Sequence, residues 1–292
     1  MNKLNKLYLK SKRILIDDKS KIVIMSDCHR GTGDSFDNFI HNQNIFNAAL
    51  IHYYNNGFSY IELGDGDEMW ETNNYKDIVR EHIDTFRLLK KFHDDNRFYM
   101  IYGNHDILKK YKKTLQDNFY TYYNKATRVN EELLNNLQVY ESLILDYKNH
   151  DIFLIHGHQV DFFSGTLWRL ARFLVRHIWR HLERLGIKDP TSAAKNYNET
   201  KRIEKRLKKW SIRNKKKVIS GHTHRPIFPT LGESLYFNAG SCIHPNGITA
   251  LEIENGNITL VKWMFRLEDD KIISVGRVVV EESTPIINYF LY

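Results

Sequence analysis

The 292-residue sequence has only two cysteines, Cys28 and Cys242, and it lacks long apolar runs. Two cysteines are too few for a disulfide framework, which favours a reducing compartment. The basic N-terminal stretch, MNKLNKLYLKSKRILIDDKS, has no apolar core of the kind found in signal peptides. No apolar run is long enough to cross a bilayer. We therefore expect a cytoplasmic protein, and contact with the inner face of the membrane stays open.

The chain also lacks internal repeats and low-complexity linkers, so we expect a single domain over residues 1–292. Its composition is 42% hydrophobic, which is enough for a large core. The net charge of +8 is unevenly distributed. Residues 166–217 hold 17 Lys and Arg against 4 Asp and Glu, so the rest of the chain is net acidic.

Several short apolar runs end in polar loops, and their length and β-branched content predict buried strands. These runs are residues 21–26, 60–63, 98–102, 151–155 and 218–220. Helix-like stretches at 42–55 and 75–93 separate the first three runs, which indicates a β-α-β-α-β order. After residue 225 the pattern predicts antiparallel strands. They are residues 234–238, 248–254 and 257–265, with 275–281 as a further strand. A turn at Asn255-Gly256 joins two of them.

A basic helical segment interrupts the strands, and we interpret residues 162–216 as an inserted cap. Residues 167–185 predict a helix with an apolar stripe and a file of arginines. The stripe is Leu167, Ala171, Leu174, Ile178, Leu182 and Leu185, and the file is Arg169, Arg172, Arg176, Arg180 and Arg184. Gly186 and Pro190 end this helix, and residues 193–214 predict a second, strongly basic one.

Metal-binding residue types gather at the carboxyl ends of the five predicted strands, where open α/β sheets place their ligand sites. The segments are Asp27-Cys28-His29, Gly64-Asp65-Gly66-Asp67-Glu68, Gly103-Asn104-His105-Asp106, His156-Gly157-His158 and Gly221-His222-Thr223-His224. If the last strand continued, His222 and His224 would face the same side, because side chains alternate along a strand. Neighbouring residues face opposite sides, so Cys28 is expected to be buried and inert.

These motifs, in this order, resemble the signature of the calcineurin-like metallophosphoesterases: D-x-H, GD-x-x-[DE], GNH-[DE], a lone His and GH-x-H. The resemblance implies an α/β fold, a four-layer α-β-β-α sandwich, with an inserted helical cap. It also implies two divalent metal ions. One would be held by Asp27, His29, Asp65 and His224, and the other by Asp65, Asn104, His156 and His222. Oxygen and imidazole ligands without thiolate favour Mn²⁺, with Fe or Zn as alternatives.

The resemblance further implies a hydrolase acting on a phosphate or pyrophosphate ester, by in-line attack of a hydroxide that bridges the metals. The expected catalytic residues are Asn104, His105 and Asp106. Asn104 would be a metal ligand, and His105 would stabilise the transition state or protonate the leaving oxygen. Asp106 would orient the imidazole of His105. Asp67 and Glu68 are expected to support the ligands.

Within that superfamily, the layout is most similar to the bacterial UDP-2,3-diacylglucosamine diphosphatases, through the SDCH, GDGDE, HGHQVD and GHTHRP motifs. Those enzymes usually carry Arg at the place of His105. A His there leaves room for a poorer leaving group, as in a phosphomonoester or phosphodiester. The expected partner is therefore a phosphorylated or nucleotide-diphosphate substrate. The alternatives are a UDP-sugar lipid or other lipid-linked phosphate, and a substrate of Ser/Thr-phosphatase-like or nuclease type.

The predicted cap allows three interpretations. It could lie on an anionic membrane surface and admit a lipid-linked phosphate. It could form a basic groove for nucleic acid, with salt-sensitive contacts. It could also pack on the core and leave its charges solvated. A non-enzymatic scaffold is disfavoured, because every expected ligand residue is present.

Overall fold

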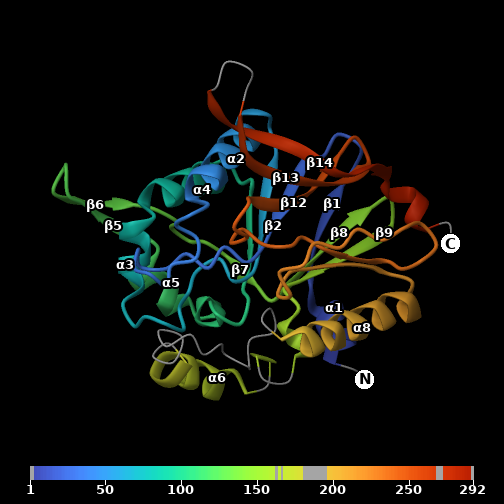
Figure 1. Cartoon of the computed structure of the whole chain (residues 1–292), viewed down its shortest axis with the longest axis horizontal. Helices are drawn as coiled ribbons and strands as arrows, with labels where there is room; N and C mark the ends of the chain where they lie inside the picture. Colours follow the sequence, from blue (N-terminus) through green and yellow to red (C-terminus); the bar gives the residue numbers. More distant parts are fainter. Residues whose placement is uncertain (1–2, 162–163, 166, 180–195, 268–271, 291–292) are drawn as a thin grey trace.

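The computed structural model describes residues 3–161, 164–165, 167–179, 196–267 and 272–290. Two β-sheets pack face to face between outer helices (Figure 1). The five-stranded sheet has the order β1 (Lys12–Ile16), β8 (Ser142–Tyr147), β9 (His150–Ile155), β10 (Lys217–Ser220) and β11 (Tyr236–Asn238). The seven-stranded sheet has the order β14 (Ile273–Pro285), β13 (Asn257–Leu267), β12 (Ile248–Glu254), β2 (Ile22–Met25), β3 (Ser59–Leu63), β4 (Phe98–Ile101) and β7 (Val139–Tyr140). A separate ribbon pairs β5 (Thr121–Asn124) with β6 (Val129–Glu132).

Helices cover the outer face of each sheet. The seven-stranded sheet is covered by α2 (Gln43–Asn55), α3 (Tyr75–Glu81), α4 (Ile83–Asp94) and α5 (Lys112–Asn118). The five-stranded sheet is covered by α1 (Lys3–Lys10) and α8 (Tyr197–Asn214). The connections include η1 (Ile107–Lys110), η2 (His158–Val160), α6 (Trp168–Leu174), the π-helical turn η4 (Val175–Trp179) and η5 (Ile286–Phe290).

Three hydrophobic clusters lie between the four layers and pack them together. Between the sheets, Ile24 and Ile61 of one sheet pack with Leu145 and Ile219 of the other. A second cluster joins the seven-stranded sheet to α2 and α4, and a third joins the five-stranded sheet to α1 and α8. Burial of this apolar area is the main favourable contribution to folding. The predicted four-layer α-β-β-α sandwich is therefore confirmed.

The five predicted strands are present as β2, β3, β4, β9 and β10. Within each sheet they run parallel, so their carboxyl ends lie at one edge. The predicted helix at 75–93 is divided into α3 and α4 at His82. The buried ring of His82 is held by Asp37, at 2.7 Å, and Gln43, at 2.9 Å.

The direction of one predicted strand is wrong. β11 runs parallel to β10, with Val218 opposite Tyr236 and Ser220 opposite Asn238, whereas an antiparallel strand was expected. Its composition marks a buried strand in either direction, and the direction depends on the path of the preceding loop. The hairpin of β12 and β13 is confirmed. Asn255 and Gly256 have φ values of 52° and 71°, as a tight hairpin turn requires.

The first helix of the predicted cap packs differently from its expected stripe. Trp168, Ala171 and Val175 contact Trp70 of the core, whereas Ile178 is 41% exposed. Ile178 lies in the π-helical turn η4, whose residue spacing differs from the α-helical period on which the expected stripe was based. Leu182, Leu185, Arg180, Arg184, Gly186 and Pro190 lie outside the described residues.

The second helix of the predicted cap belongs to the outer layer. α8 buries Ile203, Leu207 and Trp210 on the five-stranded sheet. Asn196 caps its first turn by accepting hydrogen bonds from the backbone N–H groups of Asn198 and Glu199. The division of the chain into one domain with a cap at 162–216 stays a prediction.

Candidate metal centre

The seven predicted metal ligands follow strands whose carboxyl ends share one edge of the sandwich. They are Asp27, His29, Asp65, Asn104, His156, His222 and His224. Strands β2, β3 and β4 place the first four, and β9 and β10 place the last three. Both sheets therefore contribute residues to one site.

Two groups of these side chains converge, and one carboxylate faces both. In the first group, His224 Nε2 lies 3.1 Å from Asp27 Oδ1 and 3.3 Å from His29 Nε2. In the second group, His156 Nε2 lies 3.1 Å from Asp65 Oδ2, and His222 completes the cluster. Asp65 Oδ2 is also 3.8 Å from His29 Nε2. Each group keeps its candidate ligand atoms within 4.8 Å of one another, as a shared metal ion requires.

The donors at this site fit cations. Asp27 Oδ1, Asn104 Oδ1 and His156 Nε2 are buried, and among the described residues none of the three makes a hydrogen bond of good geometry. The nearest groups to Asp27 Oδ1 and His156 Nε2 are the other candidate ligands, His224 and Asp65, at 3.1 Å. A buried polar atom without such a bond costs about 1–3 kcal/mol, so three of them in one place fit a bound cation. Asn104 lies in the loop that contacts Asp65, since the backbone N–H of His105 donates to Asp65 Oδ1 at 2.8 Å.

Most of these residues have strained backbones. The φ values are 56° for Asp27, 49° for His29, 51° for Asp65, 66° for His222 and 55° for His224. A left-handed φ is uncommon outside glycine and costs about 1–3 kcal/mol, so the surrounding fold must impose it. The expected strand geometry of His222 and His224 is wrong, because β10 ends at Ser220. His222 and His224 instead lie in the loop after β10, and each side chain belongs to a different ligand group.

Hydrogen bonds fix the orientation of the imidazoles. His156 Nδ1 donates to the carbonyl oxygen of Leu63 at 2.9 Å, which leaves Nε2 facing the site. His29 Nδ1 donates to Glu68 Oε2 at 2.9 Å, with the same result for its Nε2. Ligating histidines in metalloproteins commonly use their second nitrogen in this way.

His105 is held by Glu68 and Trp70. His105 Nδ1 lies 2.8 Å from Glu68 Oε1, and the Trp70 ring stacks on the imidazole with ring centroids 4.2 Å apart. The His105 ring also meets that of His29 edge-on at 4.7 Å. It is close enough to His29 and Asp65 to form a third candidate group with them.

The predicted role of Asp106 as the partner of His105 is wrong. Its carboxylate accepts from the backbone N–H groups of Gly66, at 3.1 Å, and Gly103, at 2.7 Å. It also pairs with Lys109 Nζ at 3.0 Å. Asp106 thus joins the loops that carry Asp65 and Asn104, and its two oxygens are used there.

Neighbouring charges shift the pKa values of several side chains in the site. Burial alone would raise the pKa of Asp27, but the nearby His224 and His156 outweigh it and hold the pKa well below its ordinary value. Burial would lower the pKa of His156, but the carboxylates of Asp65 and Asp27 raise it to about 9. Burial would raise the pKa of Glu68, but His105 and, to a smaller extent, His29 lower it to about 2. Without metal, the imidazoles of His29 and His156 therefore hold protons, because the carboxylates beside them outweigh burial and raise the pKa of both rings.

Two residues of the site were not anticipated from the sequence. Asp161 Oδ2 lies 3.1 Å from His222 Nε2, and both side chains are buried. Trp70 covers His105 from the next loop. Asp161 ends the HGHQVD motif and Trp70 directly follows GDGDEM. Their position in or beside these motifs was the one feature of the sequence that could have indicated a role in the site.

Two glycines allow the close approach of these loops. Gly64 has φ +92°, and a Cβ there would lie 2.5 Å from His156 Nδ1. A Cβ at Gly221 would lie 2.5 Å from Asp27 Oδ2 and 1.9 Å from Ser26 Oγ. All three distances are shorter than a Cβ contact permits, so the GD and GH motifs require glycine for steric reasons.

Cys28 is buried, as expected. Burial raises the pKa of its thiol well above the ordinary value, and the neighbouring Cys242 raises it further. The thiol therefore stays protonated, which keeps it a poor metal ligand and nucleophile.

The family description "calcineurin-like phosphoesterase superfamily domain" matches residues 21–254. A predicted phosphoesterase from Streptococcus pneumoniae TIGR4 is 14% identical, with 89% of this chain and 97% of that chain covered and a TM-score of 0.35. Vps29 from Chaetomium thermophilum is 10% identical, with 92% and 99% covered and a TM-score of 0.43. A cold-active protein-tyrosine phosphatase from a Shewanella species is 12% identical, with 92% and 84% covered and a TM-score of 0.40. A comparison with curated proteins found no match.

Proposed function

Because this chain belongs to the calcineurin-like phosphoesterase superfamily, we propose that it hydrolyses a phosphate or pyrophosphate ester at two divalent metal ions. The observation that carries the proposal is a pair of neighbouring ligand groups with the Asp65 carboxylate between them, 3.1 Å from His156 Nε2 in one group and 3.8 Å from His29 Nε2 in the other. A bridging carboxylate between two cation sites is the arrangement expected for hydrolytic two-metal centres.

We assign Asp27, His29, Asp65 and His224 to one ion, and Asp65, Asn104, His156 and His222 to the other. Their oxygen and imidazole donors suit Mn²⁺ best, with Fe or Zn as alternatives. Such ions, when bound, supply positive charge that polarises the phosphoryl group and activates water. The protein holds the ligands in place through Leu63, Glu68 and the left-handed backbone.

His105 is the proposed general acid. Glu68 occupies its Nδ1, so Nε2 is the nitrogen that can give a proton to the departing oxygen. Stacking on Trp70 restricts rotation of the ring. Proton donation matters most when the leaving group is a poor one, so His105 favours a phosphomonoester or phosphodiester over a pyrophosphate.

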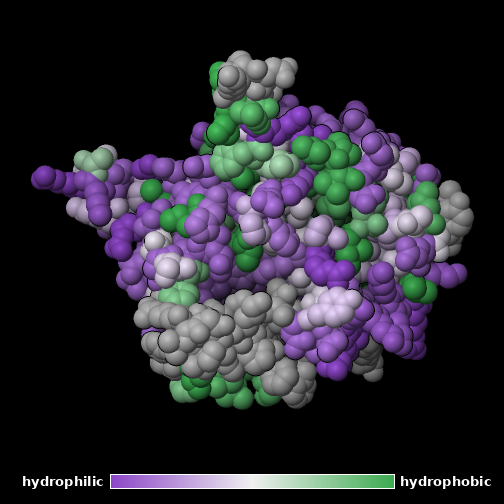
Figure 2. Space-filling model, in the orientation of Figure 1, coloured by the Kyte–Doolittle hydropathy of each residue, from purple (hydrophilic) through white to green (hydrophobic). Residues whose placement is uncertain are grey.

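A lipid-linked phosphate is the finer proposal for the substrate, and a UDP-sugar lipid is its pyrophosphate alternative. It is supported by Leu170, Phe173 and Ile178, which are 51%, 55% and 41% exposed on α6 and η4. Figure 2 shows hydrophobic residues along this lower edge of the molecule. In the same segment Arg176 donates hydrogen bonds to the carbonyl oxygens of Met69 and Thr72, and these bonds hold the helix against the loop after β3. Exposed apolar residues on a fastened helix suit contact with acyl chains or an anionic membrane surface. Within the described ranges, no helix combines the length and hydrophobicity needed to cross a bilayer.

The test is Mn²⁺-dependent hydrolysis by the full chain across four substrates: an aryl monoester, an aryl diester, a UDP-sugar and a UDP-linked diacyl sugar. We expect turnover of at least one, and loss of both bound metal and turnover in Asp65→Ala and His222→Ala. Preference for the acylated UDP-sugar would establish a lipid pyrophosphatase, and preference for aryl esters would assign the acid role to His105. Wild-type hydrolysis by either variant would disprove the metal assignment, and absence of any hydrolysis by the wild type would favour a binding scaffold.

A further inference from the structure

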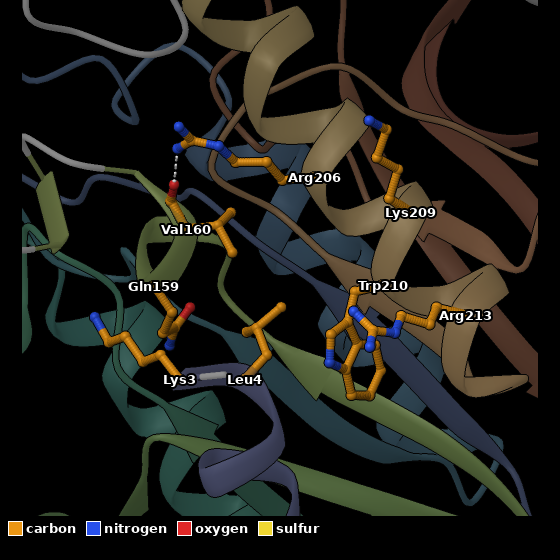
Figure 3. Close-up of a pocket in the computed structure, with 8 residues that line it drawn as sticks. All are labelled: Lys3, Leu4, Gln159, Val160, Arg206, Lys209, Trp210 and Arg213. Carbon is orange, nitrogen blue, oxygen red and sulfur yellow. Dashed lines mark hydrogen bonds between the residues drawn. The ribbon is translucent and has the colours of Figure 1, made fainter. Parts of the chain in front are cut away.

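A second concave site lies outside the metal centre, between α1, η2 and α8. Its volume is about 430 Å³, within the range of pockets that hold small ligands. Figure 3 shows the residues from these three elements arranged around one hollow. The lining residues are Lys3, Leu4, Gln159, Val160, Arg206, Lys209, Trp210 and Arg213.

The lining is basic on its rim and apolar at its base. Four of the eight residues are cationic and exposed, and none is acidic. Leu4 and Trp210 are 2% and 6% exposed, so they form a rigid apolar wall. The polar atoms of Gln159 and Trp210 are already used, since Gln159 bonds Gly157 and Glu141, and Trp210 Nε1 donates to Asn5.

The cations of this basic pocket are not neutralised by the protein. In the part of the chain that the structure describes, Lys3, Lys209 and Arg213 form no ion pair, and Arg206 donates only to the carbonyl oxygen of Val160. By contrast, Arg202 on the same helix pairs with Glu199. Like charges around one cavity repel each other, so an anion placed among them is stabilised by all four.

The arrangement follows from the sequence of α8. Residues 206, 209, 210 and 213 have the spacing i, i+3, i+4 and i+7, which puts them on one face of the helix. The other basic residues of α8, including Lys201 and Lys205, lie outside the pocket lining. The face that packs against α1 therefore carries its own set of cations.

We propose that this basic pocket binds the phosphate group of a phosphate ester, with Lys209, Arg213, Arg206 and Lys3 contacting the oxygens and Trp210 and Leu4 contacting the attached organic part. Arg and Lys are the side chains that hold phosphate by charge-assisted hydrogen bonds. The ester is either a small soluble phosphomonoester or the head group of phosphatidic acid, since both present the same phosphomonoester dianion. The site does not depend on the proposed hydrolysis at the metal centre.

The pocket is close to the metal centre along the chain. Gln159 follows His156 by three residues, so their Cα atoms are at most about 11 Å apart. A ligand held in the pocket therefore lies near the edge at which the predicted metal ligands converge.

The test compares two double variants of the full chain that remove the same charge. Lys209→Gln with Arg213→Gln alters the pocket, and Lys201→Gln with Lys205→Gln is the control on the same helix. Binding of glycerol 3-phosphate is followed by ³¹P NMR in the presence of EDTA, which suppresses binding at the metal centre. We expect the pocket variant to raise the dissociation constant about tenfold or more, and the control to change it less than about twofold.

A second arm separates the two sources of the phosphate. The same proteins are sedimented with phosphatidylcholine vesicles with and without phosphatidic acid. Pocket-dependent binding to phosphatidic acid, without measurable binding of glycerol 3-phosphate, assigns the site to a phospholipid head group. Equal losses in both variants, or no binding of either probe by the wild type, would overturn the proposal.

Discussion

Replacement of Glu68 by Gln should weaken metal binding, because one carboxylate orients two imidazoles. Glu68 is 6% exposed, and its pKa is lowered to about 2, so it is ionised at neutral pH. Its two oxygens accept from His29 Nδ1 at 2.9 Å and His105 Nδ1 at 2.8 Å. Both contacts are charge-assisted hydrogen bonds, each worth about 1.5–3 kcal/mol.

A Gln at this position has one oxygen and one amide N–H₂ group, so it can accept from only one of the two rings. If the N–H₂ group faces His29, the His29 ring must either lose its partner or move its proton to Nε2. That nitrogen faces Asp65 and Asp27, and a protonated Nε2 cannot ligate a metal. The loss of one such contact predicts about a 10- to 100-fold weaker affinity for Mn²⁺.

The assay is the dissociation constant of Mn²⁺, measured by competition with a chelator, together with turnover of an aryl phosphate ester. Glu252→Gln is the matched control, because Glu252 is also buried and accepts from Arg277 Nε at 2.8 Å and Tyr53 at 2.6 Å on β12. The control should lower stability and leave Mn²⁺ affinity unchanged. If Glu68→Gln keeps wild-type affinity for Mn²⁺ and wild-type turnover, the orienting role of Glu68 is refuted. A separate variant, Asp106→Asn, tests the role first expected of Asp106. Slower turnover by that variant, with an unchanged melting temperature, would restore that role.

Three further predictions follow from the same contacts. His105→Gln should keep the metal and slow hydrolysis by about 10²–10⁴, checked by metal analysis and kcat, and a wild-type rate would exclude acid catalysis. Metal binding should release protons, and metal affinity should increase from pH 7 to 9, because the pKa of His156 is raised to about 9 without metal and a ligating imidazole must be neutral. Calorimetry in buffers of different protonation enthalpy measures the number of protons released. A metal affinity that does not depend on pH would contradict this prediction. Lys217→Met should stabilise the fold at pH 7 by about 1–3 kcal/mol. Burial lowers the pKa of Lys217 to about 6, and its amine lies over the ring of Phe290 without a hydrogen-bond partner among the described residues. The unfolded wild type binds more protons from pH 6 up to the ordinary Lys value of 10.5, so its stability should rise with pH in that window, and urea unfolding of the variant should lack this rise.

The order of strands and ligand residues could be predicted from the sequence because both are local. A run such as residues 151–155 is apolar over the length of a strand, and His156 follows it directly. Parallel strands bring their carboxyl ends to one edge, so the residues after β2, β3, β4, β9 and β10 were expected near one another.

The partners of those residues could not be predicted in the same way. Asp106 is adjacent to His105 in sequence, and that proximity made it the expected orienting group. The structure gives this position to Glu68, 37 residues earlier, because the loop after β3 packs against the loop after β4. Similarly, Asp161 reaches His222 across 61 residues.

The sequence by itself therefore determined the strands that precede the site, β2, β3, β4, β9 and β10, and the identity of the expected ligands, since hydrophobic periodicity and side-chain chemistry are properties of short segments. The four layers were expected from the family resemblance. Only the tertiary structure decided the direction of β11, the packing of α8 on the five-stranded sheet, and the left-handed backbones of Asp27, Asp65 and His222. The reason is physical. These features are imposed by contacts between segments far apart in the chain, and a strained φ persists only where such contacts outweigh its cost.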